Sequence, residues 1–158
     1  MLWVRVLRVK PLLRPARPED RAAEEALLTE VGLPLAGLDE CFANTWVAEA
    51  GDDPSGSTRL VGMAGVEIYP DGALLRSVAV HPHWRGRGLG CALVMRALEA
   101  AGEAGVLDVY LLTTNAADWF PRLGFAPIAR EAVPVGVRQS IEFREVCPVS
   151  ATVMHQVL

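Results

Sequence analysis

The chain has 158 residues, which is enough for one domain with a continuous core; 51% of its residues are hydrophobic and 22% are charged. Its net charge of −4 gives no bulk positive charge of the kind that nucleic acids attract, so we expect no nucleic-acid partner. The three cysteines form no Cys-x-x-Cys pair, and no apolar run approaches the roughly 20 residues of a membrane span. These features predict a cytoplasmic protein with free thiols and no membrane association.

The first half of the chain predicts one long helix and several strands. Residues 1–9 alternate apolar and basic side chains and form either a leader or an extra strand, so we assign residues 10–158 to a single domain. A helix begins near Pro18, where acidic residues occupy the first turn, and Gly32 ends it. Its apolar face contains Ala23, Leu27, Leu28 and Val31. The other expected elements are a strand at 11–16, a helix at 35–42, a strand at 45–50, a hairpin loop at 51–58, and antiparallel strands at 59–69 and 73–80.

The second half adds helices and further strands. Residues 89–103 predict a mostly buried helix, since its charged residues fall on one stripe. Residues 106–113 are a continuous apolar run, which indicates a strand covered on both faces. The remaining expected elements are a short helix at 116–123, a strand at 125–130, a helix near 137–146 and a strand at 150–156. Strands and helices mixed around one sheet predict an α/β or α+β fold.

The segment from Ser77 to Gly90 combines a strand end, a turn that contains proline, and glycines that lead into a helix. The glycines let the backbone approach an anion, and the first amides of the helix lack intrahelical acceptors at the positive end of its dipole. Arg85 and Arg87 add positive charge. Together these features predict a phosphate site. For Gly-x-Gly alone, the alternative is a glycine-rich turn with solvated arginines.

The spacing of this segment fits neither a P-loop nor a dinucleotide fingerprint. It resembles motif A of the GNAT N-acetyltransferase superfamily, in Arg85-Gly-Arg-Gly88-Leu-Gly90 directly after a strand that ends in Val-His-Pro. A second block, from Leu112 to Phe125, resembles the next GNAT strand and the Leu-Gly-Phe turn that follows it. The resemblance implies a mixed, mostly antiparallel sheet with splayed central strands and flanking helices.

The resemblance also implies that acetyl-CoA is a cosubstrate, lies between the splayed strands and is attacked directly by an amine. Val78 would then donate its N–H to the developing oxyanion. Asn115 either touches the pantetheine arm or caps the following helix. The implied cofactor-binding residues are Val78, Ala79, Val80, Arg85, Gly86, Arg87, Gly88, Leu89, Gly90, Cys91, Asn115 and Phe120.

Phe120 departs from the family pattern, because many members place a tyrosine there as general acid for the departing CoA thiolate. A thiol has a pKa of about 8.5, so the thiolate can leave at neutral pH with modest help from water or another residue. The candidates for that residue are Tyr69, Tyr110 and Cys147.

The attacking amine must lose a proton, and Glu67, late on the strand beside the motif A strand, is the predicted base. Its alternative is a solvent-facing glutamate paired with Arg76 across the hairpin. Arg76 either binds a substrate carboxylate or is an ordinary surface arginine. Ser77 and Thr114 are further candidates on the substrate side, as groups that hold water.

Two other features of the sequence favour structural interpretations. His81 and His83 have no third ligand nearby, so we predict a solvated turn and no metal site. Trp84 and Trp119 either cover the cofactor or pack in the core.

Among GNAT subgroups, the chain from about Pro11 onward is most similar to the small amino-acid N-acetyltransferases found with arsenic-resistance genes, which are related to N-acetylglutamate synthases. The segments that carry this similarity are 74–80, 111–114, 127–130 and 147–151. The similarity implies that the acceptor is a small α-amino acid or an arsenic- or phosphorus-containing analogue. The alternatives are a peptide or protein N-terminal acetyltransferase and a non-catalytic acetyl-CoA sensor. A homodimer is the family's common assembly.

Overall fold

The computed structural model describes residues 10–51 and 57–158. The expected leader or strand at residues 1–9 and most of the expected hairpin loop at 51–58 lie outside these ranges. The described strands form one seven-stranded sheet in the order β1-β2-β3-β4-β5-β7-β6. Neighbouring strands are antiparallel except for β4 and β5, which are parallel. The predicted mixed, mostly antiparallel α/β sheet is confirmed.

The strands and helices follow one another along the chain in the expected order. The strands are β1 (Leu12–Pro15), β2 (Thr45–Gly51), β3 (Thr58–Tyr69), β4 (Gly72–Val80), β5 (Asp108–Thr113), β6 (Ala126–Pro127) and β7 (Thr152–Val157). The α-helices are α1 (Arg21–Val31), α2 (Leu38–Cys41), α3 (Leu89–Glu103) and α4 (Val135–Arg138). Short 3-10 turns occupy Pro18–Asp20, Phe42–Asn44, Pro82–Trp84, Phe120–Leu123 and Arg130–Ala132, and a π-helix spans Glu142–Val146.

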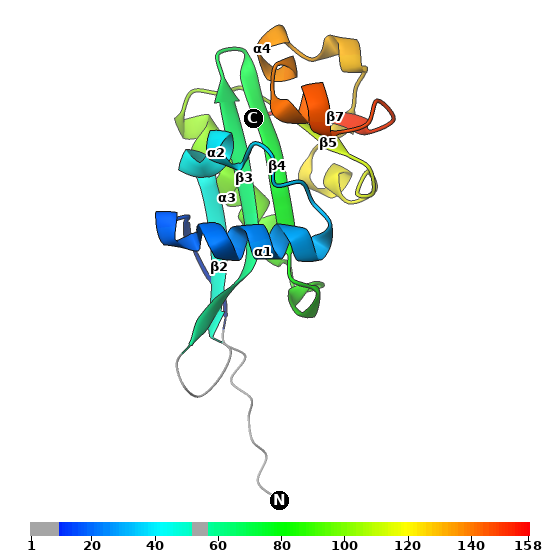
Figure 1. The fold of residues 1–158 in the computed structure, drawn as a ribbon. Helices are drawn as coiled ribbons and strands as arrows, with labels where there is room; N and C mark the ends of the chain where they lie inside the picture. The colour runs from blue at the N-terminus through cyan, green and yellow to red at the C-terminus, as the bar shows by residue number, and fades with distance from the viewer. Residues whose placement is uncertain (1–9, 52–56) are drawn as a thin grey trace, which may run out of the picture.

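Helices cover both faces of the sheet. In Figure 1, α1 crosses in front of β3 and β4, α2 lies in front of the sheet beside β3, and α3 lies behind the sheet. The core between the sheet and α3 is the largest and includes Leu93, Val94 and Ala97. Leu27 and Leu28 of α1 form a second core with Met63 and Ala79. A third cluster joins Leu74 and Tyr110 to α4 and β7.

The face that α1 buries differs from the predicted one. Leu27 and Leu28 are buried as expected, but Ala23 is exposed and Glu24 is buried in its place, with 1% of its surface exposed. Burial raises the pKa of the Glu24 carboxyl, because the charged form loses its hydration. Apolar spacing could not indicate a carboxylate on this face.

The C-terminal third is more irregular than its sequence pattern predicts. The helix expected at 116–123 is a 3-10 turn over Phe120–Leu123, and the strand expected at 125–130 shortens to Ala126–Pro127. Pro127 cannot donate to a strand ladder, which favours an early end. The helix expected near 137–146 divides into α4 and the π-helix, with Gln139 to Ile141 between them.

A β-bulge in β4 changes which face its side chains occupy. The pairing with β3 shifts between Gly65↔Arg76 and Met63↔Ala79, and Ser77 has φ of 54°. Leu75 packs toward α3 but Ala79 packs toward α1, although residues four apart on a regular strand share a face. The bulge therefore turns the strand over at Ser77.

The two parallel strands diverge after a short contact. Only Ala73↔Val109 and Leu74↔Tyr110 pair between β4 and β5. Beyond these pairs the strands separate, and the gap opens where β4 carries Arg76, Ser77 and Val78. This is the splay that the sequence resemblance implied.

Candidate active site

Two cavities meet at the splayed strands. The strand cavity, of about 480 Å³, lies between β4 and β5 and is lined by Arg76, Ser77 and Thr113 among others. The loop cavity, of about 580 Å³, lies beside the glycine-rich turn before α3. Residues common to both walls are Leu33, Val78, Asn115, Ala116 and Trp119. Molecules in the two cavities would therefore meet beside Val78.

The loop cavity has the features of an anion site. Gly86 and Gly88 adopt positive φ values of 73° and 78°, and a side chain at either position would point into open space. Gly88 is the N-cap of α3, whose first intrahelical bond runs from Ala92 N–H to Gly88 C=O. The amides of the three residues between them therefore have no acceptor within the helix. These residues fit a pyrophosphate group.

Arg85, Trp84 and Trp119 line the same cavity, and Arg87 lies beside it, against Trp84. Arg85 Nε donates to the Val80 carbonyl over 3.1 Å, and Arg87 lies 4.8 Å from the centre of the Trp84 ring. Trp119 lies against Gly90, where an added Cβ would meet its ring at 3.2 Å. Trp84 and Trp119 are half-buried, pack against the main core and also line the cavity, so the two interpretations of these rings are compatible.

The structure brings most of the predicted cofactor residues together. Two of them lie outside the loop cavity, because Arg87 does not line it and Phe120 lines the strand cavity instead. The predicted residues that line the loop cavity are Val78, Ala79, Val80, Arg85, Gly86, Gly88, Leu89, Gly90, Cys91 and Asn115.

Asn115 does not cap a helix. Thr113 Oγ1 accepts a hydrogen bond from Ala116 N–H over 3.0 Å, and the 3-10 turn begins only at Phe120 with Trp119 as its N-cap. The capping alternative is therefore wrong, and Asn115 is exposed where the two cavities join. Thr114, another predicted residue, lines the strand cavity.

A buried charged cluster lies beside the strand cavity. Arg76 Nη2 donates to the Ala36 carbonyl over 2.6 Å, and its Nε donates to Ser77 Oγ over 3.2 Å. Its guanidinium also contacts two carboxylates, Glu67 at 3.5 Å and Glu142 at 3.8 Å. The Arg76 side chain has 0% exposed surface. The surface-arginine alternative is therefore wrong.

Glu67 lies deeper than the prediction placed it. It is 0% exposed, so the solvent-facing alternative is wrong, although its pairing with Arg76 is present. Its other oxygen accepts a hydrogen bond from the Tyr69 hydroxyl over 2.9 Å. Burial raises the pKa of Glu67, and these two partners oppose the rise. Glu67 lines neither cavity, and its role as base stays a prediction.

Sequence reasoning missed Glu142. This carboxylate lines the strand cavity, and burial raises its pKa to about 7. It lies in a segment where the sequence predicts an ordinary helix, and no motif marks it. Its contact with Arg76 joins residues far apart in the chain, so no local signal could have found it.

Phe120, at the position of the usual tyrosine, and the three candidate general acids lie in different places. Phe120 is buried, lines the strand cavity and packs edge-on against Trp119 and Phe125, with ring centres 4.9 and 5.8 Å apart. Cys147 lines the same cavity, and burial raises the pKa of its thiol to about 11. Tyr69 and Tyr110 line neither cavity.

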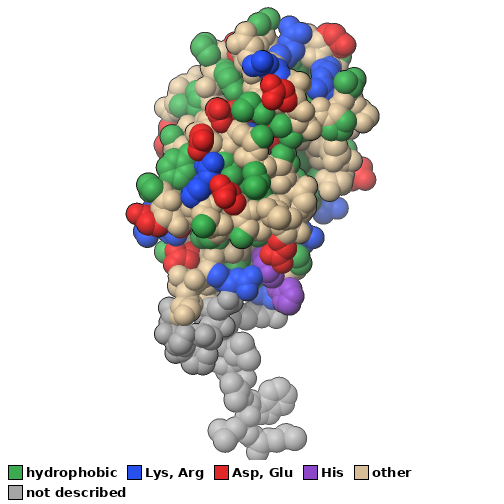
Figure 2. All heavy atoms as spheres, in the orientation of Figure 1, with side chains coloured by type: hydrophobic (Ala, Val, Ile, Leu, Met, Phe, Trp, Pro, Cys, Tyr) green, Lys and Arg blue, Asp and Glu red, His purple; other side chains and the backbone are tan. Residues whose placement is uncertain are grey.

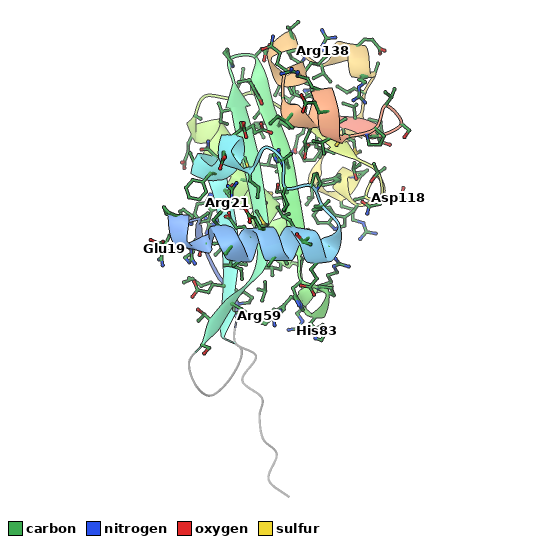
Figure 3. The ribbon with its side chains drawn as sticks, in the orientation of Figure 1. Glu19, Arg21, Arg59, His83, Asp118 and Arg138 are labelled. Carbon is green, nitrogen blue, oxygen red and sulfur yellow. The ribbon has the colours of Figure 1, made fainter. Side chains whose placement is uncertain are left out.

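The sequence predicts a solvated turn at His81 and His83, but His81 is withdrawn from solvent. His81 is buried, its Nδ1 accepts from His83 N–H over 3.2 Å, and its Nε2 lies 3.4 Å from Glu30 of α1. Figure 3 places His83 at the lower end of the molecule, opposite Arg138. Within residues 10–51 and 57–158, no three His, Cys, Asp or Glu side chains gather as metal ligands would.

The surface and the helices carry two further observations. On the face in Figure 2, acidic and basic side chains are interspersed with hydrophobic ones. Among the residues that the structure describes, no helix combines the length and apolar character needed to cross a membrane.

Comparisons with known proteins agree with this geometry. Residues 42–127 match the family described as acetyltransferase (GNAT) domain. The chain is 33% identical over 133 residues to an amino-acid acetyltransferase of Mycobacterium tuberculosis, a match that covers 80% of this chain and 73% of that protein. The chain belongs to the GNAT acetyltransferase family and is an acyltransferase.

Other relatives are longer, and solved structures share the fold. The chain is 32% identical over 78 residues to an amino-acid acetyltransferase of Aeromonas salmonicida, covering 48% of this chain but only 18% of that protein. The crystal structure of a Mycobacterium tuberculosis protein in complex with CoA and NLQ has a TM-score of 0.75, 28% identity and coverage of 94% and 99% of the two chains. N-acetylglutamate synthase from Neisseria gonorrhoeae, complexed with coenzyme A and N-acetyl-glutamate, has a TM-score of 0.76 at 22% identity; the match covers 94% of this chain and 35% of the synthase, and it supports the fold alone.

Proposed function

We propose that this enzyme transfers the acetyl group of acetyl-CoA directly to the amine of a small α-amino acid or an arsenic- or phosphorus-containing analogue. The main support is that the loop cavity and the strand cavity share a wall at Val78. A thioester reaching this wall from the loop cavity would meet an amine held in the strand cavity. The names of the relatives support an amino-acid acceptor.

Every proposed role but that of Glu67 uses a residue that lines one of the two cavities. The glycine-rich turn and the first amides of α3 would hold the pyrophosphate, and Val78 N–H would donate to the developing oxyanion. Arg76, the residue predicted to hold the acceptor's carboxylate, already contacts Glu67 and Glu142, so it would have to exchange one of these contacts for that carboxylate. Ser77 and Thr114 would hold water. Glu67, as the sequence predicts, would take the amine proton only through an intervening group, since it lines neither cavity.

The size of the strand cavity, about 480 Å³, supports a small acceptor. Gly32 to Pro34 and Val146 to Pro148 are among the residues that line it. These walls favour a compact molecule. The sensor alternative depends on Phe120 in place of the usual tyrosine, yet a thiolate of ordinary pKa can leave without a strong acid. A homodimer and a cytoplasmic location stay predictions.

Turnover assays with acetyl-CoA test this function. We expect acetylation of one or more free α-amino acids or their arsenic- or phosphorus-containing analogues, and much slower acetylation of peptides with free N-termini. Faster turnover of peptides would support the N-terminal acetyltransferase, and acetyl-CoA binding without any turnover would support the sensor.

A further inference from the structure

Glu142 lies at the start of the π-helix Glu142–Val146. Such wide turns are rare and occur frequently at functional sites. Here the π-helix forms part of the wall of the strand cavity, to which Glu142, Val146 and the following Cys147 contribute. Glu142 is 6% exposed, so its carboxylate is largely withdrawn from solvent and still borders the cavity.

We infer that Glu142 is the catalytic base of this site, which holds the acceptor's ammonium group in the strand cavity and takes its proton. The inference rests on the proposed function and deepens it, because it names the group that prepares the amine for attack. It competes with the sequence prediction, which gives this role to Glu67.

The charges of the cluster favour an incoming cation. Glu67, Arg76 and Glu142 bring two carboxylates to one guanidinium. With both carboxylates ionised, the cluster has an excess negative charge, and a buried charge is costly unless a cation pairs with it. An ammonium group in the strand cavity supplies that cation.

The hydrogen bonds favour Glu142 over Glu67 as the partner of the acceptor's ammonium group. Both oxygens of Glu67 already face donors, the Tyr69 hydroxyl at 2.9 Å and Arg76 Nη1 at 3.5 Å. Arg76 Nε donates to Ser77 Oγ, and its 3.8 Å separation from Glu142 exceeds hydrogen-bond distance. Glu142 therefore retains capacity for a ligand in the cavity that it lines.

The proton transfer balances without any further reactant than acetyl-CoA. The Glu142 carboxylate takes one proton from the acceptor's ammonium, which leaves a neutral amine. The amine nitrogen then forms a bond to the acetyl carbon, the carbon–sulfur bond breaks, and the sulfur leaves with the bonding electrons as the CoA thiolate. The second proton of the nitrogen passes to the thiolate through water, and Glu142 returns its proton to solvent.

This role predicts a pH dependence. Burial raises the pKa of Glu142 to about 7; Glu67 on β3 adds to the rise, and Arg76 on β4 opposes it. Cys147 also faces this carboxylate, and its thiol stays neutral in this range because burial raises its pKa to about 11. A carboxylate accepts a proton only above its pKa, so kcat/KM for the acceptor should rise through a limb near pH 7.

The experiment begins with turnover of an amino-acid acceptor by the wild type, which tests the proposed function separately. Glu142→Gln should then lower kcat by about 100-fold or more and remove the limb near pH 7. The thermal shift with acetyl-CoA should be retained. Glu145→Gln, an exposed position on the same π-helix, is the matched control and should keep both kcat and the limb.

Glu67→Gln separates the two candidate bases. It should keep the limb but move it to lower pH, because Glu142 loses a negative neighbour. Glu142→Gln should fold. A carboxyl whose pKa is raised in the folded state lowers the stability of the protein as pH rises toward that pKa, and glutamine removes this loss. Arg76 keeps its contact with Glu67 in this variant.

Three results would overturn the inference. The first is wild-type kcat in Glu142→Gln, and the second is loss of the limb in Glu67→Gln but not in Glu142→Gln. The third needs no variant and is a wild-type profile without a limb near pH 7. Absence of wild-type turnover with every acceptor would instead overturn the proposed function, and the inference with it.

Discussion

Among the residues that the structure describes, Ser77 is the one non-glycine residue with a positive φ, 54°. The geometry of the site depends on this residue. The bulge at this residue moves Val78 and Val80 to the α3 face and leaves Arg76 on the face of the buried cluster. Left-handed backbone at a residue with a Cβ costs about 1–2 kcal/mol. The fold therefore tolerates local strain where the two cavities meet.

Substitution of Ser77 tests whether this backbone conformation matters more than the hydroxyl. Ser77→Val should lower the free energy of unfolding by about 1–3 kcal/mol and reduce kcat, because a β-branched residue disfavours positive φ. Ser77→Gly removes the same hydroxyl but permits the conformation, so it should lose less of both quantities. Urea unfolding and steady-state kinetics measure them. Equal losses in the two variants would assign the effect to the hydroxyl that accepts from Arg76.

Phe120 allows a second test at this scale, with Phe125 as its control. Phe120 lines the strand cavity, so a tyrosine hydroxyl at this position can reach it. Phe125 is only 2% exposed, so a hydroxyl there would enter the core. Phe120→Tyr should therefore leave the melting temperature nearly unchanged, and Phe125→Tyr should cost about 1–3 kcal/mol through an unpaired hydroxyl. Calorimetry measures both. If Phe120→Tyr also raises kcat, thiolate departure limits the wild type; an equal loss of stability in both variants would contradict the cavity assignment.

The elements show what sequence patterns determine and what they omit. The helix at 89–103 was predicted with its observed bounds, since its glycine-rich start and apolar periodicity agree. Residues 137–146 also carry helical signals, but they form the end of α4 and a π-helix whose Glu142 contacts Arg76 of β4. The bulge at Ser77 and the buried Glu24 likewise depend on long-range packing. The glycine-rich turn that lines the loop cavity could thus be predicted, as could Arg76, Ser77 and Thr114 in the strand cavity, while Glu142 could not.

Helix α3 permits a controlled test of the cofactor site. Gly88→Glu places a negative charge at the N-terminus of α3 and should abolish the thermal shift caused by acetyl-CoA. Gly105→Glu is the matched control, because Gly105 has a similar φ of 84°, also faces open space and lies outside both cavities. Both variants carry the same backbone strain and charge, so only the position differs. An undiminished shift in folded Gly88→Glu would remove the pyrophosphate from this turn.

At the scale of the whole molecule, the splayed strands join the two binding regions. Helix α3 starts at the loop cavity, and residues Gly32 to Pro34 after α1 border the strand cavity. His81, which follows β4, contacts Glu30 of α1. Val31 of α1 and Leu89 of α3 both line the loop cavity, so helices from opposite faces of the sheet border it. Because Val78 lies in both walls, the proposed function brings both substrates together before transfer. The architecture thus favours transfer within a ternary complex.

Direct transfer predicts that no cysteine carries the acetyl group. Cys41 is buried away from both cavities, whereas Cys91 borders the loop cavity and Cys147 the strand cavity. The raised pKa of Cys147, about 11, keeps it a poor nucleophile at neutral pH.

Cys41→Ser, Cys91→Ala and Cys147→Ser should each keep turnover within about 10-fold of the wild type, since loss of a covalent nucleophile would cost far more. Intact mass spectrometry of the enzyme with acetyl-CoA alone should detect no acetyl adduct, and initial rates should give intersecting double-reciprocal lines. A stable adduct on Cys91 or Cys147 with parallel lines would replace the ternary complex by an acetyl-enzyme.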